Sequence, residues 1–131
     1  MALPEVVIDT GSIAGIDAAG GVRAFLGIPF AAPPIGSLRW RAPQPAAPWQ
    51  GVRRCERYGD ACVQHGMTAD AIMKQFSFET PPECGISEDC LYLTVWAPDD
   101  AGSNKLPVMV FLYGGGQRFG SGSHPVSRCR K

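Results

Sequence analysis

The sequence has no uninterrupted hydrophobic run of the ~20 residues that span a bilayer, and its start shows no basic segment followed by a hydrophobic one. It therefore predicts neither a membrane segment nor a secretory signal. The compartment stays open: cytoplasmic, or secreted if the start is incomplete. Charge of one sign is also lacking, because 12 Lys and Arg balance 12 Asp and Glu. Without a basic surface that displaces counterions, no nucleic-acid partner is expected.

The sequence is rich in turn-forming residues without being of low complexity. Its 16 Gly and 12 Pro together make 28 of 131 residues, or 21%, which is below the roughly 25–30% at which disorder becomes the default expectation. Apolar residues account for 45% of the chain and charged residues for 18%. These values predict one globular domain at most, with much turn and loop.

Five cysteines are an odd number, so at least one thiol stays unpaired if the others pair. They are Cys55, Cys62, Cys84, Cys90 and Cys129. A zinc site would draw on Cys62, His65, Cys84 and Cys90, but structural zinc sites usually hold two tight pairs of ligands, and these cysteines are too widely spaced. A Cys–His catalytic dyad stays possible, since such partners meet in space. Buried or disulfide-bonded cysteines are the favoured interpretation, and no cofactor or metal is expected.

The first half of the chain predicts β-structure followed by coil. Short antiparallel strands are expected at 6–8, 13–16 and 22–28, the last broken by Gly27 and Pro29. Six prolines between positions 29 and 51 exclude a regular helix or a central strand there. That segment is predicted to be an extended coil, held to the surface by Trp40 and Trp49.

The second half predicts one helix and two strands. Residues 68–78 have helical spacing with Thr68 as N-cap. The run LYLTVW at 91–96 is rich in β-forming residues. The run VMVFLY at 108–113 is apolar on both faces, which is typical of a strand covered on both sides in an α/β sheet.

Three glycines at 114–116 follow the second of these runs. A phosphate-binding loop would need Lys and Ser or Thr where Ser121 and Gly122 stand, and a dinucleotide-binding fingerprint would need glycine where Phe119 stands. The oxyanion loop of an ester hydrolase fits the strand, the glycines and their order, because such a loop donates N–H groups to a tetrahedral intermediate. A glycine-rich turn without chemistry is the alternative.

Four segments between residues 25 and 123 extend this pattern, and the likeness that they carry covers residues 5–123. They are FLGIPFAAPPIGSLRWRAPQPAAPWQGVR at 25–53, YGDACVQ at 58–64, SEDCLYLTVWAP at 87–98 and LPVMVFLYGGGQRFGSGS at 106–123. In this order they resemble the type B carboxylesterases, the α/β-hydrolase group that includes the cholinesterases. The resemblance covers nearly the whole chain but only about the first quarter of a typical member.

The resemblance implies a fold, a domain division and site residues. The expected fold class is α/β: the incomplete N-terminal part of an α/β-hydrolase, with antiparallel edge strands leading into a mixed central sheet. Residues 1–123 would be that portion, and 124–131 a divergent basic tail. Gly115 and Gly116 resemble the oxyanion-hole donors. Cys62 and Cys90 stand where the family has its first disulfide.

The sequence also departs from the family. Gln117 stands where Phe is usual, and residues 63–89 contain no Trp that could stack on a quaternary ammonium group, so a choline ester is not the expected substrate. No G-x-S-x-G segment is present: the nearest, at 85–89, ends in Asp. His124 is therefore not expected to be the catalytic histidine, because no nucleophilic serine precedes it. Glu88 and Asp89 are expected to be structural, because adjacent strand residues face opposite sides.

These observations predict an N-terminal fragment of a serine carboxylic-ester hydrolase. Its partner in the full-length protein is a small-molecule carboxylic ester, and the fragment is expected to be inactive alone, with exposed apolar surface. The alternative is a fragment of a non-catalytic, cholinesterase-like adhesion or binding protein. A small independent disulfide-bonded module is a third hypothesis.

Overall fold

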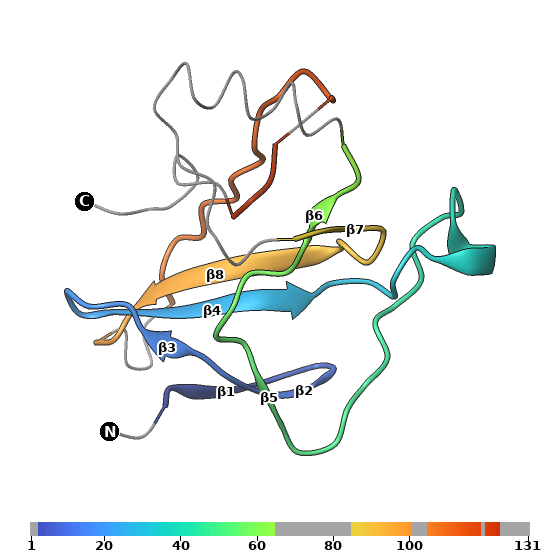
Figure 1. Cartoon of the computed structure of the whole chain (residues 1–131). Coiled ribbons are helices and arrows are strands. Elements are labelled where there is room, and N and C mark those ends of the chain that lie inside the picture. Colours follow the sequence, from blue (N-terminus) through green and yellow to red (C-terminus); the bar gives the residue numbers. More distant parts are fainter. Residues whose placement is uncertain (1–2, 65–84, 101–104, 119, 124–131) are drawn as a thin grey trace.

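The computed structural model describes residues 3–64, 85–100, 105–118 and 120–123 (Figure 1). These residues form strands, turns and coil. The elements in chain order are β1 (Glu5–Ile8), β2 (Gly11–Ala14), β3 (Ile16–Asp17), β4 (Val22–Pro29), the 3₁₀-helix η1 (Gly36–Leu38), β5 (Val52–Arg54), β6 (Ala61–Cys62), β7 (Ile86–Ser87) and β8 (Tyr92–Pro98). The described part of the chain has no helix with the length and hydropathy needed to cross a bilayer.

The described strands form two three-stranded sheets and one small pair. The first sheet has the order β1-β2-β5, in which β1 runs antiparallel and β5 parallel to β2. The second has the order β3-β4-β8 and is antiparallel throughout. Strands β6 and β7 pair in parallel. Figure 1 shows β4 and β8 as the two long strands at the centre, with the first sheet below them. The strands predicted at 6–8 and 22–28 are confirmed as β1 and β4, whereas the strand predicted at 13–16 is divided between β2 and β3, which lie in different sheets.

Strand β4 does not end at Gly27, contrary to the prediction of a broken strand. Its register with β8 shifts between Phe25 and Ile28, which marks a β-bulge. Gly27 lies in this bulge with φ +67°, a left-handed conformation that glycine adopts without a steric penalty. The bulge absorbs the irregularity, and the pairing continues to Pro29. The predicted strand at 91–96 is also confirmed, as β8.

Cys55 joins the two larger sheets. Its backbone N–H donates to the Ala14 carbonyl oxygen over 2.7 Å, and its carbonyl oxygen accepts from the Leu26 N–H over 2.7 Å. Its side chain is 1% exposed and packs with Ile13, Phe25 and Ile28. This small cluster is the core of the described part of the molecule.

The proline-rich segment is coil apart from η1, as predicted, but only one of its two tryptophans holds it in place. Trp49 donates its Nε1–H to the Ser12 carbonyl oxygen over 2.8 Å and lies against the core. Trp40 is 96% exposed, so its predicted role as an anchor is wrong. A tryptophan pins a coil only where a backbone acceptor and an apolar surface lie within its reach.

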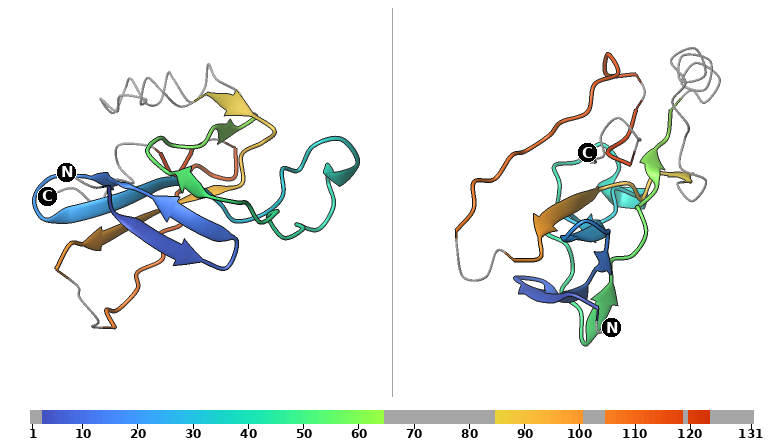
Figure 2. Two further views of the ribbon diagram at one scale, coloured as in Figure 1. Left: turned by 90° about the horizontal axis from the view of Figure 1, so that it is seen from below. Right: turned by 90° about the vertical axis from the view of Figure 1, so that its left-hand side faces the viewer.

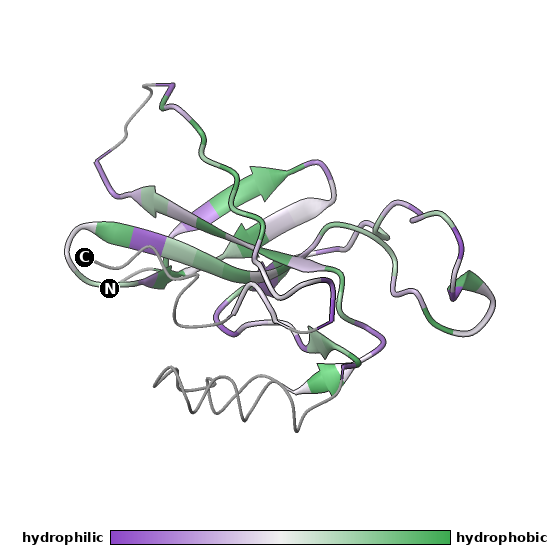
Figure 3. Ribbon diagram, turned by 90° about the horizontal axis from the view of Figure 1, so that it is seen from above, coloured by the Kyte–Doolittle hydropathy of each residue, from purple (hydrophilic) through white to green (hydrophobic). Residues whose placement is uncertain are grey.

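The predicted buried strand at 108–113 is not observed as a strand. Residues 105–113 take part in no backbone hydrogen bond to any other described residue. In Figure 2 they run as a coil apart from the strands, and Figure 3 colours most of this coil as hydrophobic. Val108, Met109 and Leu112 are 87%, 88% and 85% exposed. The prediction was wrong for this chain because a ladder needs a neighbouring strand, and no described segment supplies one. The helix predicted at 68–78 lies outside the described residues.

Candidate active site: the glycine loop

The segment from Gly114 to Gly120, called here the glycine loop, turns sharply directly after the exposed apolar coil. The Arg118 N–H donates to the Gly115 carbonyl oxygen over 3.1 Å. The two residues between them, Gly116 and Gln117, have φ +60° and +59°. Positive φ at both central positions is the pattern of a type I′ turn. Gln117, the residue that departs from the family, thus occupies a position that favours glycine or asparagine.

The two predicted oxyanion donors lie on this turn. Within the described residues, neither the Gly115 nor the Gly116 N–H donates a hydrogen bond. A Cβ placed on Gly116 would meet no atom within 4 Å beyond the adjoining residues. A main-chain N–H group that has no acceptor within the protein can donate to a ligand oxygen, which is what an oxyanion hole requires.

The base of the glycine loop is bonded to a residue 56 positions earlier in the chain. The Gly120 N–H donates to Gln64 Oε1 over 2.7 Å, and Gln64 Nε2 donates to the Gly120 carbonyl oxygen over 3.1 Å. Ser123, just beyond, is 5% exposed, and its hydroxyl lies 2.7 Å from that of Ser121. The sequence reasoning missed Gln64, although it lies in the matched segment YGDACVQ.

Cys62 and Cys90 meet as the resemblance implies, but as thiols. The Cys62 thiol donates a hydrogen bond to Cys90 Sγ over 3.0 Å, so the disulfide is not formed in this structure. Burial, the contact with Cys62 and the nearby carboxylates of Asp89 and Glu88 raise the pKa of Cys90 to about 12. The predicted disulfide stays a prediction for the oxidised chain. Of the other cysteines, Cys55 is buried, as the sequence favoured, while Cys84 and Cys129 lie outside the described residues.

Glu88 and Asp89 have separate partners. Glu88 Oε2 accepts from Arg39 Nη2 over 2.6 Å in an exposed ion pair that ties the end of η1 to the acidic segment. Asp89 lies beside Tyr92, whose pKa is raised by burial and by this carboxylate. The two residues lie between β7 and β8, so the predicted strand alternation is not what separates them. The acidic pair is structural because each carboxylate has its own neighbour.

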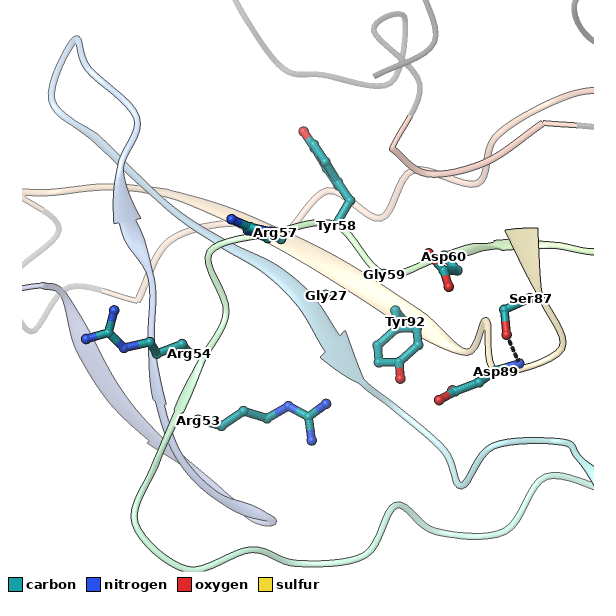
Figure 4. Close-up of a pocket in the computed structure, with 10 residues that line it drawn as sticks. All are labelled: Gly27, Arg53, Arg54, Arg57, Tyr58, Gly59, Asp60, Ser87, Asp89 and Tyr92. Atoms are coloured by element: carbon teal, nitrogen blue, oxygen red, sulfur yellow. Dashed lines mark hydrogen bonds between the residues drawn. The ribbon is translucent and has the colours of Figure 1, made fainter. Parts of the chain in front are cut away.

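An open polar pocket of about 300 Å³ lies between β4, β5, β7, β8 and the segment that joins β5 to β6 (Figure 4). Arg53 reaches toward the Tyr92 ring, whereas Arg54 points away from it. The lining carries charges of both signs and includes no residue of the glycine loop; it consists of Gly27, Arg53, Arg54, Arg57, Tyr58, Gly59, Asp60, Ser87, Asp89 and Tyr92. The pocket is therefore separate from the candidate oxyanion donors.

Two further candidates of the sequence stay untested by the geometry. His65, a possible zinc ligand or dyad partner, and His124 lie outside the described residues. Among the residues that are described, no group of three or more His, Cys, Asp and Glu side chains could hold a metal ion.

Comparisons with known proteins find similarity along most of the chain. The profile of the Carboxylesterase family matches residues 2–128. Fumonisin B1 esterase of Sphingopyxis macrogoltabida is 43% identical over 124 residues, which are 93% of this chain and 21% of that protein. Carboxylesterase 5A of Homo sapiens is 46% identical over 105 residues, 78% of this chain and 18% of that protein. The chain thus spans about a fifth of the length of these curated relatives.

A solved structure extends the likeness to three dimensions. A PNB esterase superposes with a TM-score of 0.82 at 35% sequence identity, covering 97% of this chain and 24% of that one. The arrangement of the described strands, coil and glycine loop is therefore similar to one part of a much longer esterase chain.

Proposed function

The chain belongs to the carboxylesterase family and has the fold of the N-terminal part of an α/β-hydrolase, and from this premise we propose that it supplies the oxyanion loop of a serine carboxylic-ester hydrolase. In the complete site a serine attacks the ester carbonyl, and a histidine takes and returns its proton. The Gly115 and Gly116 N–H groups hold the negative charge on the carbonyl oxygen. Water then cleaves the acyl-enzyme.

One observation carries this proposal. The Gly115 and Gly116 amides lie on a tight turn, donate to no acceptor within the described residues, and have open space beside Gly116. A structural turn needs glycine for its φ angles, but it does not need free donors side by side. Losing one oxyanion-hole donor typically costs about 10²–10³ in rate.

The proposal assigns no turnover to these 131 residues alone. They contain no G-x-S-x-G segment, and the proposal therefore assigns the nucleophile, together with the acid and the histidine that serve it, to segments outside these residues. We expect the purified 131-residue chain to hydrolyse 4-nitrophenyl acetate no faster than buffer. Turnover that a serine-directed inhibitor blocks would contradict this part of the proposal.

A chimera tests the oxyanion role directly. Residues 1–123 replace the corresponding quarter of the PNB esterase, which is 35% identical to this chain. We expect the chimera to hydrolyse 4-nitrophenyl acetate. Replacing Gly116 by glycolic acid through protein ligation removes its N–H without adding a side chain. This change is expected to lower kcat by about 10²–10³.

The matched control is the same replacement at Gly122, which is exposed and also has open space beside it. It is expected to leave kcat unchanged. Equal effects at the two positions, or no effect at Gly116, would show that the Gly116 N–H does not hold the oxyanion.

The proposed substrate class is a small carboxylic ester without a quaternary ammonium group. Residues 63–89 lack the Trp that would stack on such a cation. In the chimera, 4-nitrophenyl acetate is therefore expected to be turned over far faster than a choline ester.

A further inference from the structure

Both polar atoms of the Gln64 carboxamide make hydrogen bonds. Its Oε1 accepts from the Gly120 N–H over 2.7 Å. Its Nε2 donates to the carbonyl oxygens of Gly120 and Cys62, each over 3.1 Å. Because an N–H only donates, the atom that faces the Gly120 N–H must be the amide oxygen, which determines the orientation of the carboxamide. Gln64 thus pairs with both backbone groups of Gly120, as a neighbouring strand would.

Gly120 in turn closes the base of the glycine loop. It has φ +111°, and a Cβ at this position would lie 2.7 Å from the Gly114 carbonyl oxygen and 3.0 Å from the Tyr113 ring. The first and last residues of the loop are therefore in contact. Holding Gly120 in place also determines where Gly114 begins the turn.

The turn has little other support. Within the described part of the chain, residues 114–118 make no hydrogen bond to another segment, and the Arg118–Gly115 bond is internal to the turn. The preceding coil is largely exposed and lies in no described sheet, and its last residue, Tyr113, is partly buried near Cys62 and Cys90. The position of the Gly115 and Gly116 amides thus depends on the base of the loop, where Gln64 is bonded.

We propose that Gln64 is a positioning residue for the oxyanion loop: by pairing with the Gly120 backbone it sets where the Gly115 and Gly116 N–H groups lie. The role of those N–H groups rests on the proposed function, whereas the pairing itself does not. A displacement of about 1 Å at a reacting centre costs up to about 10²-fold in rate, so such a clamp affects catalysis without touching the substrate.

The first test is Gln64→Met, which keeps the length of the side chain and removes its hydrogen bonds. In the 131-residue chain we expect hydrogen exchange at the Gly120 N–H to speed up about tenfold. The ¹⁵N–¹H signals of Gly115 and Gly116 are expected to shift. The signals of β4 should stay in place, which separates a local effect from unfolding. Unchanged Gly115, Gly116 and Gly120 signals would overturn the proposal.

Gln44→Met is the matched control. Gln44 Nε2 also donates to a carbonyl oxygen two residues earlier, that of Ala42, over 3.1 Å. It shares the local bond of Gln64 but not the bonds to Gly120. We expect no shift at Gly115 or Gly116, and equal shifts in both variants would overturn the assignment.

Gln64→Glu provides a rescue by pH. A carboxylate accepts from the Gly120 N–H but cannot donate to the Gly120 carbonyl oxygen, whereas the protonated acid does both. The Gly115 and Gly116 signals should therefore return toward their wild-type positions as pH falls through the carboxyl pKa of about 4.3. Signals that stay displaced at low pH would contradict the two-point pairing.

In the chimera, Gln64→Met is expected to lower kcat about tenfold or more with little change in KM, because the clamp acts on the transition state. An unchanged kcat in an active chimera would overturn the proposal. An inactive chimera would count against the proposed function alone, since the exchange and shift measurements decide the role of Gln64 independently.

Discussion

At position 27 glycine is required for two reasons, its backbone conformation and the lack of space for a side chain. Its φ of +67° favours glycine, and a Cβ there would lie 2.5 Å from the Arg57 carbonyl oxygen and 3.0 Å from the Gly59 N. Gly20 has nearly the same φ, +66°, but a Cβ there would meet no atom within 4 Å. The pair separates backbone strain from steric overlap.

We expect Gly20→Ala to lower the free energy of unfolding by about 1–2 kcal/mol, the cost of a left-handed alanine. Gly27→Ala should cost a further 1–3 kcal/mol, roughly the penalty for overpacking, because the overlap is with backbone atoms. Urea denaturation of the two variants beside the wild type measures the difference. Equal losses would mean that the bulge yields to the added methyl group.

The buried Cys55 thiol is expected to make the folded chain less stable at alkaline pH. Burial raises the pKa of this thiol, although the nearby Arg53 lowers it in part. The folded chain therefore keeps a proton that the unfolded chain loses above its ordinary thiol pKa of about 8.5. Stability is at its full value below that pH and falls as pH rises toward the folded pKa, by at most about 1.4 kcal/mol per pH unit.

The measurement for Cys55 is urea denaturation at pH 7.5 and pH 9.5, with Cys55→Ala as reference. Cys90, Tyr92 and Tyr113 also have raised pKa values, and the reference retains their contributions. The wild type is expected to lose more stability between the two pH values than Cys55→Ala. If the wild type and Cys55→Ala lose the same amount of stability between the two pH values, Cys55 is not the cause of the loss.

Among the elements, the end of β6 and the start of β8 are joined by a side-chain contact. Strand β6 ends at Cys62, which contacts Cys90 just before β8. Two residues after Cys62, Gln64 is bonded to the glycine loop. The two cysteines and the candidate oxyanion loop therefore belong to one connected group of contacts.

We expect oxidation of Cys62 and Cys90 to a disulfide to stabilise the chain by roughly 3–4 kcal/mol, because it closes a loop of about 29 residues. Urea midpoints with and without a reducing agent measure this, and Cys62→Ser should show no such difference. Since the pKa of Cys90 is raised to about 12, bond formation is expected to speed up as pH rises above neutral. Thiol titration first establishes that Cys62 and Cys90 are oxidised. If the urea midpoint of that oxidised chain is the same with and without the reducing agent, the prediction is contradicted.

At the scale of the whole molecule, the main feature is an exposed apolar coil. Residues 108–113 are between 46% and 88% exposed, and all six are large and hydrophobic. Isolated exposed hydrophobic residues are ordinary, but a continuous run of them with unpaired backbone is typical of a surface made for another segment. In the PNB esterase, three quarters of the chain lie beyond the matched part.

We therefore expect the 131-residue chain to associate in a concentration-dependent way through this coil. Leu112→Lys is expected to lower the average molar mass measured by light scattering. Val7→Lys, at a residue 81% exposed on β1, serves as control and should change it less. If both variants associate like the wild type, the contact lies elsewhere.

The sequence was enough to predict some parts of the fold and of the candidate site, but not others. Local patterns predicted the β-structure of 6–28 and β8, and the segment matches predicted the family, because alternating apolar residues, prolines and glycines act through their immediate neighbours. The patterns failed at Gly27, at Trp40 and at 108–113. In each case the outcome depended on a partner that is distant in the sequence: β8 for the bulge, a backbone acceptor for the indole, and a pairing strand for the apolar run.

By itself the sequence determined where glycine, cysteine and proline stand along the chain. Their positions were enough to predict the turns, the family and the two candidate oxyanion amides. Only the tertiary structure decided that Cys55 joins two sheets, that Cys62 faces Cys90, and that Gln64 pairs with Gly120 across 56 positions. The physical reason is that hydrogen bonds and packing act over a few ångströms, and sequence separation carries no such distance until the chain has folded.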